Sequence, residues 1–182
     1  MQEIIKKVLL RLEETSGQFW NIPKDSGNIM NLIIKAAGYK NILEVGTSNG
    51  YSSIWLAEAA RYNSGHVTTM EYYQERIELA QANIEEAGLQ DFVTLLQGKA
   101  LDILPVIKII PDFVFIDANK AEYLAYFEII NSILESGGMF AADNVTSHKG
   151  EMEDFLDSIS KNINYQTTYL PFGGGLLLAL KK

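Results

Sequence analysis

The sequence contains no cysteine, only two histidines and four prolines, and no long apolar run. Without cysteine, the chain can form neither a disulfide scaffold nor a thiolate nucleophile or thiolate metal site. Every apolar run is shorter than the roughly 18 residues that a membrane-spanning helix needs. Residues 1–7 carry charges where a signal peptide would have an apolar core. We therefore expect a cytoplasmic protein that does not interact with a membrane.

Positive charge is also scarce, with 15 lysines and arginines against 23 aspartates and glutamates, which gives a formal net charge of −8. Such a chain repels nucleic acid phosphates unless its cations gather on one face. A small-molecule substrate is therefore favoured over nucleic acid. The length of 182 residues and the hydrophobic fraction of 47% are typical of one globular domain with a sizeable core.

Apolar runs of strand length alternate with segments of helical periodicity, a pattern typical of βαβ units and a mostly parallel sheet. The strands are expected near residues 41–46, 66–71, 92–96, 112–117 and 138–143. The helices between them are expected near 50–61, 73–87, 101–109 and 121–135, the second and fourth being followed by Gly88 and Gly137–Gly138 as stop signals. The sheet core should contain Ile42, Leu43, Val45, Val114, Phe115 and Ile116.

The two ends of the chain follow different patterns. Two helices near 2–15 and 26–37 precede the first strand and should cover the sheet or line its mouth. A helix near 150–161 is followed by Tyr165–Leu170 and Leu176–Leu180, which a short glycine-rich turn separates. Two apolar runs joined in this way indicate an antiparallel hairpin.

Two expected strands end abruptly on polar side chains. The run from Val114 to Ile116 ends on Asp117, and the run from Phe140 to Ala142 ends on Asp143 and Asn144. The carboxyl ends of neighbouring parallel strands meet at one edge of a sheet. These hard oxygens suit Mg, Ca or Mn. The alternative is structural, because Asp and Asn at strand ends often serve only as helix caps or turn residues.

A glycine-containing turn follows the first expected strand and leads directly into a helix. It runs from Gly46 to Gly50, with Ser48 in place of the middle glycine of a G-x-G-x-x-G dinucleotide motif. The acidic Glu44 precedes it, and Glu71 follows its last glycine by 71 − 50 = 21 residues. That spacing is close to the one at which a carboxylate reaches ribose hydroxyls, although Glu71 could also cap the following helix. These features favour a cationic, ribose-containing ligand over a pyrophosphate.

Together these segments resemble the class I S-adenosylmethionine-dependent methyltransferases and, within them, the cation-dependent O-methyltransferases typified by catechol and caffeoyl-CoA O-methyltransferases. The loop around Gly46 is similar to that of methyltransferases in general, and the D-A-x-K and D-N segments are similar to those of the metal-dependent branch. The resemblance implies a Rossmann-like fold with a seven-stranded, mostly parallel sheet, helices on both faces and a C-terminal antiparallel hairpin. It implies a single domain, with a helical cap over 1–37 and the core over 38–182. The matching segments are 42–52, 70–71, 98–100, 115–123, 137–138 and 142–144.

The resemblance also implies a role for each matching residue. Glu44, Gly46, Thr47 and Ser52 would hold the methionine end of S-adenosylmethionine, Glu71 its ribose, and Ala100 its adenine through the backbone. Asp117, Asp143 and Asn144 would bind a divalent cation, with Asp117 also close to the amino group of the cofactor. Lys120 would be the general base. The implied reaction is methyl transfer to a hydroxyl of a small catechol-like or phenolic substrate, and the implied assembly is a homodimer.

Some positions depart from the family pattern. Asn119 and Lys99 stand where aspartate and another acidic residue are common, and the last hairpin has Gly174 between two glycines instead of an aspartate. These changes could alter cofactor affinity. The stretch between Asn144 and Leu170, where the substrate loop of the family lies, is shorter than in the plant enzymes, so the substrate does not follow from the resemblance.

Several alternatives stay open at this level. One is a tRNA hydroxyuridine O-methyltransferase of the same family, with a basic patch around Lys149, Lys120 and Lys24. Another is an S-adenosylmethionine-binding protein without catalysis, and a nucleotide-dependent oxidoreductase is disfavoured by Ser48. Trp20 and Tyr51 could wall the active site. His148 could touch substrate or metal, but a loop or helix-start position is the favoured interpretation.

Overall fold

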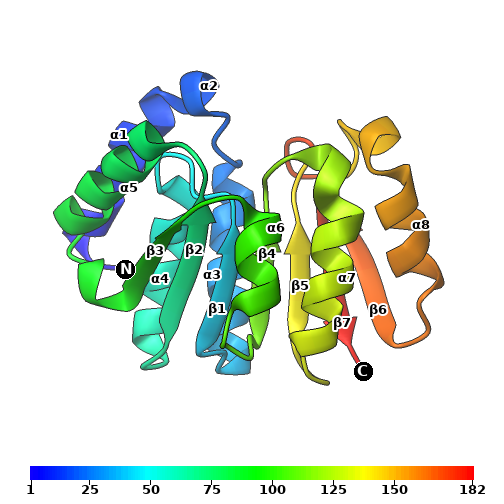
Figure 1. The fold of residues 1–182 in the computed structure, drawn as a ribbon. Coiled ribbons are helices and arrows are strands. Elements are labelled where there is room, and N and C mark those ends of the chain that lie inside the picture. The colour runs from blue at the N-terminus through cyan, green and yellow to red at the C-terminus, as the bar shows by residue number, and fades with distance from the viewer.

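The computed structural model describes residues 1–182, in which one seven-stranded sheet lies between two layers of helices (Figure 1). The strand order is β3-β2-β1-β4-β5-β7-β6. The first five strands in this order pair in parallel, and β7 runs antiparallel to both β5 and β6. The expected fold class and the C-terminal hairpin are thereby confirmed. The strands are β1 (Asn41–Val45), β2 (His66–Glu71), β3 (Val93–Gln97), β4 (Phe113–Ile116), β5 (Met139–Ala142), β6 (Tyr165–Leu170) and β7 (Leu176–Lys181).

The helices cover both faces of the sheet, as expected. The first face is covered by α1 (Glu3–Glu14), α3 (Lys24–Ala37), α4 (Tyr51–Tyr62) and α5 (Gln74–Glu86). The second face, which is toward the viewer in Figure 1, is covered by α6 (Ala100–Ile103), α7 (Tyr123–Ile133) and α8 (Glu153–Lys161). The remaining elements are α2 (Ser16–Phe19) and the short 3₁₀ turns η1 (Gln90–Phe92), η2 (Leu104–Val106), η3 (Lys120–Glu122) and η4 (Lys149–Glu151).

Two hydrophobic clusters form the core, one on each face of the sheet. Because successive side chains of a strand point to opposite faces, Ile42 joins the first cluster while Leu43 and Val45 join the second. Phe115 and Ile116 divide in the same way. All six residues expected in the sheet core are fully buried. Continuous apolar strands are typical of parallel sheets buried on both faces.

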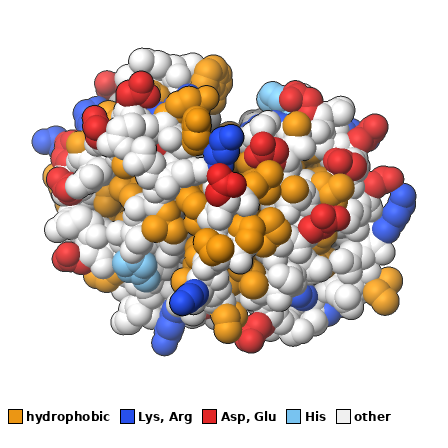
Figure 2. Space-filling view, viewed as in Figure 1, with side chains coloured by type: hydrophobic (Ala, Val, Ile, Leu, Met, Phe, Trp, Pro, Cys, Tyr) orange, Lys and Arg blue, Asp and Glu red, His pale blue; other side chains and the backbone are white.

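One expected helix is mostly absent. The segment expected as a helix over 101–109 has a single α-helical turn, α6, and a 3₁₀ turn, η2, that contains Pro105. Proline has no backbone N–H to donate and its ring crowds the preceding turn, so the helix does not continue. As a result Val106 and Ile110 are 72% and 58% exposed. Hydrophobic side chains gather on this face of the molecule around α6 (Figure 2).

The N-terminal region contains an element that the sequence pattern did not predict. The turn α2 lies between α1 and α3, and Trp20 ends it with a left-handed φ of 51°. The second of the two expected N-terminal helices begins at Lys24 rather than residue 26. None of the helices combines the length and apolar composition that crossing a bilayer requires.

Candidate active site

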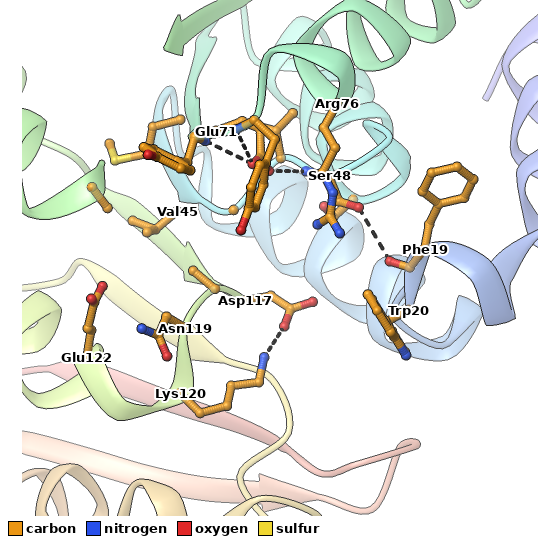
Figure 3. A pocket seen from close by; sticks show the side chains of 18 of the residues that line it. Phe19, Trp20, Val45, Ser48, Glu71, Arg76, Asp117, Asn119, Lys120 and Glu122 are labelled. Atoms are coloured by element: carbon orange, nitrogen blue, oxygen red, sulfur yellow. Dashed lines mark hydrogen bonds and ion pairs between the residues drawn. The ribbon is translucent and has the colours of Figure 1, made fainter. Parts of the chain in front are cut away.

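One cavity of about 590 Å³ lies at the carboxyl ends of β1 to β4 (Figure 3). The surface is hollowed at this edge between α2 and the start of α7 (Figure 2). Glu44 and Asp143 do not line the cavity; both are buried next to residues that do. The expected site residues that line it are Gly46, Thr47, Ser52, Glu71, Ala100, Asp117, Lys120 and Asn144.

The loop after β1 brings its backbone close to the cavity. Gly46, Ser48 and Gly50 all have left-handed φ values, of 100°, 51° and 85°. A Cβ atom on Gly46 would lie 2.2 Å from the Asp117 carbonyl oxygen, so only glycine allows the loop to pack on the end of β4. The conformation of Ser48 explains why glycine is common at this position in related motifs. Any side chain at position 46 would occupy the space in which the loop packs against Asp117.

Gly46→Ala is expected to lower the free energy of unfolding by roughly 1–3 kcal/mol, because it combines a left-handed φ with a backbone clash. Gly17→Ala is the matched control, since a Cβ there would meet nothing within 4 Å and alanine favours a helical turn. Urea unfolding curves of both variants check this expectation. Equal stability of the Gly46→Ala and wild-type proteins would contradict the close packing of the loop.

Glu71 both binds backbone N–H groups and faces the cavity. Its Oε1 accepts the N–H groups of Tyr72 and Tyr73 at 2.9 and 3.0 Å, and its Oε2 accepts the N–H of Ser48 at 3.0 Å. Because these N–H groups precede α5, whose N-terminus has no side-chain cap, Glu71 holds the turn before the helix and is not the expected helix cap. Oε1 already accepts two hydrogen bonds, but Oε2 accepts only one, so Glu71 can still accept one hydroxyl donor from a ligand through Oε2. Its contact with a ribose stays a prediction.

Glu44 lies in β1 and is completely buried. Ser53 donates its hydroxyl to Oε2, and Oε1 has no hydrogen-bond partner. Burial raises the pKa of the Glu44 carboxyl to about 7, and the hydrogen bond from Ser53 opposes this shift. Glu44 therefore supports the loop from beneath, and its direct contact with the methionine end of a cofactor stays a prediction.

The raised pKa of Glu44 makes stability depend on pH. A carboxyl whose pKa is higher in the folded state contributes stability below its unfolded-state pKa, and this contribution is lost as the pH rises through about 7. The loss should be about 3 kcal/mol at roughly 1.4 kcal/mol per pKa unit. As the pH rises from 5 to 8, the free energy of unfolding measured by chemical denaturation should therefore fall less for Glu44→Gln than for the wild type. Parallel pH dependences would contradict this assignment.

Lys120 and Asp117 form an ion pair inside the cavity. The Lys120 Nζ lies 2.6 Å from Asp117 Oδ1, and only 15% and 19% of the two side chains are exposed. Lys120 lies in η3, immediately before α7, and its Nζ is also 5.4 Å from the ring centre of Tyr123. Figure 3 shows the Lys120 ammonium and the Asp117 carboxylate pointing toward each other at the cavity wall.

Asp143 and Asn144 follow β5 directly beside this pair. Asp143 is 2% exposed, and its Oδ1 has no hydrogen-bond partner. Burial and the nearby charge of Asp117 raise the pKa of Asp143 to about 7, and the charge of Lys120 opposes this shift. Asn144 has a left-handed φ of 65° and lines the cavity. A buried carboxylate oxygen without a partner is costly and calls for a cation or a proton.

The donor set fits a hard divalent cation. No three or more His, Cys, Asp or Glu side chains are grouped so as to hold a metal ion. A metal site at this edge would therefore combine the carboxylates of Asp117 and Asp143 with the amide oxygen of Asn144. Three oxygen ligands and room for water suit Mg²⁺ or Mn²⁺. The structure brings these three residues together; their role as metal ligands stays a prediction.

The glycine turn of the last hairpin packs against the segment after Asn144. The Gly174 carbonyl oxygen accepts the N–H groups of Thr146 and Ser147 at 2.8 and 2.9 Å. A Cβ on Gly174 would lie 2.7 Å from Asn144 Nδ2. Because Gly174 does not line the cavity, the structure connects this departure from the family pattern with Asn144 rather than with a bound cofactor.

Several cavity residues were not assigned from the sequence. Tyr72, Tyr73 and Arg76 form one wall, with the Arg76 guanidinium 5.4 Å from the ring centre of Tyr73. Because Tyr72 and Tyr73 immediately follow Glu71 in the sequence, their place in the cavity wall could have been predicted. Glu122 and Tyr126 form another part of the lining; Glu122 lies within the matching segment 115–123 but was given no role, and Tyr126 lies outside every matching segment.

The N-terminal segment closes one side of the cavity. Phe19, Trp20 and Ile22 line it, as does Tyr51, whose hydroxyl donates to Glu13 Oε1 at 2.9 Å. His148 also lines the cavity. The favoured interpretation of His148 as only a loop or helix-start residue was therefore incomplete, because it both precedes η4 and faces the cavity.

Comparison with known proteins yields one family. The model of the O-methyltransferase family matches residues 2–181. A catechol O-methyltransferase of Niastella koreensis is 39% identical over 131 residues, which are 69% of this chain and 58% of that protein. Caffeoyl-CoA O-methyltransferase 1 of Eucalyptus globulus is 32% identical over 142 residues, with 72% of this chain and 56% of that protein covered. The matches thus span less than two thirds of these relatives.

Among solved structures, the O-methyltransferase TomG of Streptomyces achromogenes has a similar fold, with a TM-score of 0.86. The two sequences are 26% identical, and the match covers 100% of this chain and 91% of that one. TomG is involved in tomaymycin synthesis and was solved in complex with SAM.

Proposed function

Because this chain belongs to the O-methyltransferase family, whose model matches residues 2–181, we propose that it transfers a methyl group from S-adenosylmethionine to a hydroxyl with the help of a divalent cation. The main observation in favour of metal dependence is the buried Oδ1 of Asp143, which has no hydrogen-bond partner and lies beside Asp117 and Asn144. The proposed acceptor is a hydroxyl of a small catechol-like or phenolic molecule.

The loop residues would hold the cofactor along the edge of the sheet. Gly46 and Thr47 would lie against its methionine end, Ser52 beside them, Glu71 at its ribose and Ala100 at its adenine. Because Gly46 has no side chain, the loop packs directly on the end of β4, and its backbone would form the wall against which the cofactor lies. When bound, S-adenosylmethionine would supply an electrophilic methyl group, and the divalent cation would supply positive charge that favours the ionised acceptor hydroxyl.

The residues at the other wall would orient the acceptor and move its proton. Asp117, Asp143 and Asn144 would hold the cation, and Lys120, in its neutral amine form, would take the proton from the acceptor hydroxyl as general base. The acceptor oxygen would thereby be held toward the methyl group that bound S-adenosylmethionine would supply, with its sulfur as the leaving group. Trp20 would lie along the acceptor and limit access of water to it. Orientation of this kind supplies a large part of the rate acceleration.

A small acceptor fits the electrostatics of the cavity better than tRNA. Of the three lysines that could form a basic patch, Lys120 is paired with Asp117, and Lys24 lies 4.0 Å from Glu13. Lys149 alone is exposed without an ion-pair partner. The net charge of −8 is otherwise repulsive to nucleic acid.

Calorimetric titration with S-adenosylhomocysteine, the product of the donor, tests the cofactor part of the proposal. One molecule should bind per chain, and Glu71→Ala should weaken binding by at least about tenfold, since a hydrogen bond to a charged group contributes roughly 1.5–3 kcal/mol. Glu75→Ala is a suitable control, because Glu75 does not line the cavity. An absence of binding to the wild-type protein would refute the proposed function.

A further inference from the structure

One end of the cavity, here called the slot, is mainly apolar and holds a single carboxylate with the Asn119 amide beside it (Figure 3). Val45 and Met70 at the ends of two parallel strands, and Leu101 on α6, provide the apolar surface. Glu122 and Tyr126 complete it from η3 and α7. Figure 3 shows Glu122 at the end of the cavity opposite to Phe19 and Trp20. A mainly apolar slot with a few polar groups is suited to a heterocyclic ligand.

The carboxylate of Glu122 is held in place from one side only. Tyr126, which is 2% exposed, donates its hydroxyl proton to Glu122 Oε2. Glu122 makes no ion pair, and its Oε1 has no hydrogen-bond donor within the chain. Because the Tyr126 hydroxyl proton is committed to this bond, the pair offers the slot only acceptors. A ligand that fills the slot should therefore present an N–H or O–H donor to Glu122.

If the donor binds as proposed, the order of the strands would put its base at this end of the cavity. Asp117 and Gly46 lie at the ends of β4 and β1, Glu71 follows β2, and Ala100 follows β3. In the sheet these strands are neighbours in the order β3-β2-β1-β4. A donor whose sulfonium lies near Asp117 and whose ribose lies near Glu71 extends its base toward Ala100 and Leu101. This step rests on the proposed function.

We infer that Glu122 is a specificity-determining residue for the methyl donor, and that it accepts a hydrogen bond from the 6-amino group of adenine. Lys99, at the position of the adenine loop where an acidic residue is common, lies over the Tyr72 wall of the cavity, with its Nζ 5.9 Å from the ring centre of Tyr72, and cannot accept a hydrogen bond. Glu122 supplies an acidic acceptor from the opposite wall. Adenine presents an amino donor that matches it, and a purine without this group leaves the carboxylate desolvated and unpaired.

The test compares S-adenosylhomocysteine with its analogue in which unsubstituted purine replaces adenine, so that only the 6-amino group is deleted. The wild-type protein should prefer S-adenosylhomocysteine by about 10–100-fold, the range for a hydrogen bond to a charged group. Glu122→Gln keeps the size of the side chain but removes its charge, and it should reduce this preference about tenfold. Calorimetry of both ligands with both proteins measures the coupling.

Glu128→Gln is the matched control, because it makes the same charge change on α7 at an exposed site outside the cavity. It should keep the wild-type preference. Binding of S-adenosylhomocysteine with an unchanged preference in Glu122→Gln would overturn this inference and leave the proposed function intact. A wild-type preference near one would also overturn it, even if Glu122→Gln failed to fold. No binding of S-adenosylhomocysteine to the wild type would overturn both.

Discussion

Replacing Lys120 with methionine is expected to lower the rate of methyl transfer by about 10²–10⁴-fold, the usual contribution of a general base. The affinity for S-adenosylhomocysteine should change little, because methionine keeps the length and apolar stem of the side chain. The reason lies in the position of Lys120, whose Nζ is 2.6 Å from Asp117 Oδ1 inside the cavity. Single-turnover kinetics, together with calorimetric titration of the product, separate the two effects.

Lys149→Met serves as the control for this variant. Lys149 belongs to η4, is exposed and does not line the cavity, so its replacement should leave both the rate and the affinity unchanged. An unchanged rate in Lys120→Met would remove the proposed role of Lys120 in proton transfer. An equal loss of product affinity would instead make Lys120 a cofactor-binding residue.

Asp143→Asn is expected to weaken Mn²⁺ binding strongly, because Asp143 is itself a proposed ligand. The loss of affinity should exceed the roughly 10–100-fold that is typical when a residue hydrogen-bonded to a metal ligand is replaced. The substitution keeps the shape of the side chain and removes its charge. Asp143 is 2% exposed and its Oδ1 has no partner in the protein. Equilibrium dialysis or electron paramagnetic resonance of Mn²⁺ measures this affinity without any need for turnover.

The metal-free Asp143→Asn protein should be at least as stable as the wild type at pH 8. Its buried amide replaces a buried carboxylate that has no cation paired with it, and such a charge is destabilising. Asp157→Asn is the control, because Asp157 is exposed and pairs with Lys161 far from the cavity. Mn²⁺ binding of undiminished affinity in Asp143→Asn would exclude this carboxylate as a ligand.

The elements that form the edge of the sheet could be predicted because their pattern is local. Val114, Phe115 and Ile116 are apolar on both faces and are followed by Asp117, so both the strand and its polar end are apparent in the sequence. The same holds for Gly46, since a left-handed turn at the end of a strand restricts the choice of residue. Eight of the ten expected site residues line one cavity for this reason.

Other features depend on contacts between segments that are far apart, and no local pattern encodes them. The prediction of a helix over 101–109 was wrong because it followed the apolar periodicity of the segment, whereas Pro105 prevents the helix from continuing. Tyr126 enters the cavity because α7 packs beside α6. Trp20 reaches the cavity because α2 ends in a left-handed residue.

Methyl transfer from S-adenosylmethionine to a panel of catechols, measured with Mg²⁺ or Mn²⁺ and then with a chelator, tests the central claim most directly. Turnover should require the divalent cation, disappear with the chelator and return when the metal is restored. The cation held by Asp117, Asp143 and Asn144 is the proposed source of this dependence. Tight binding of S-adenosylhomocysteine together with turnover that the chelator leaves unchanged would contradict the account.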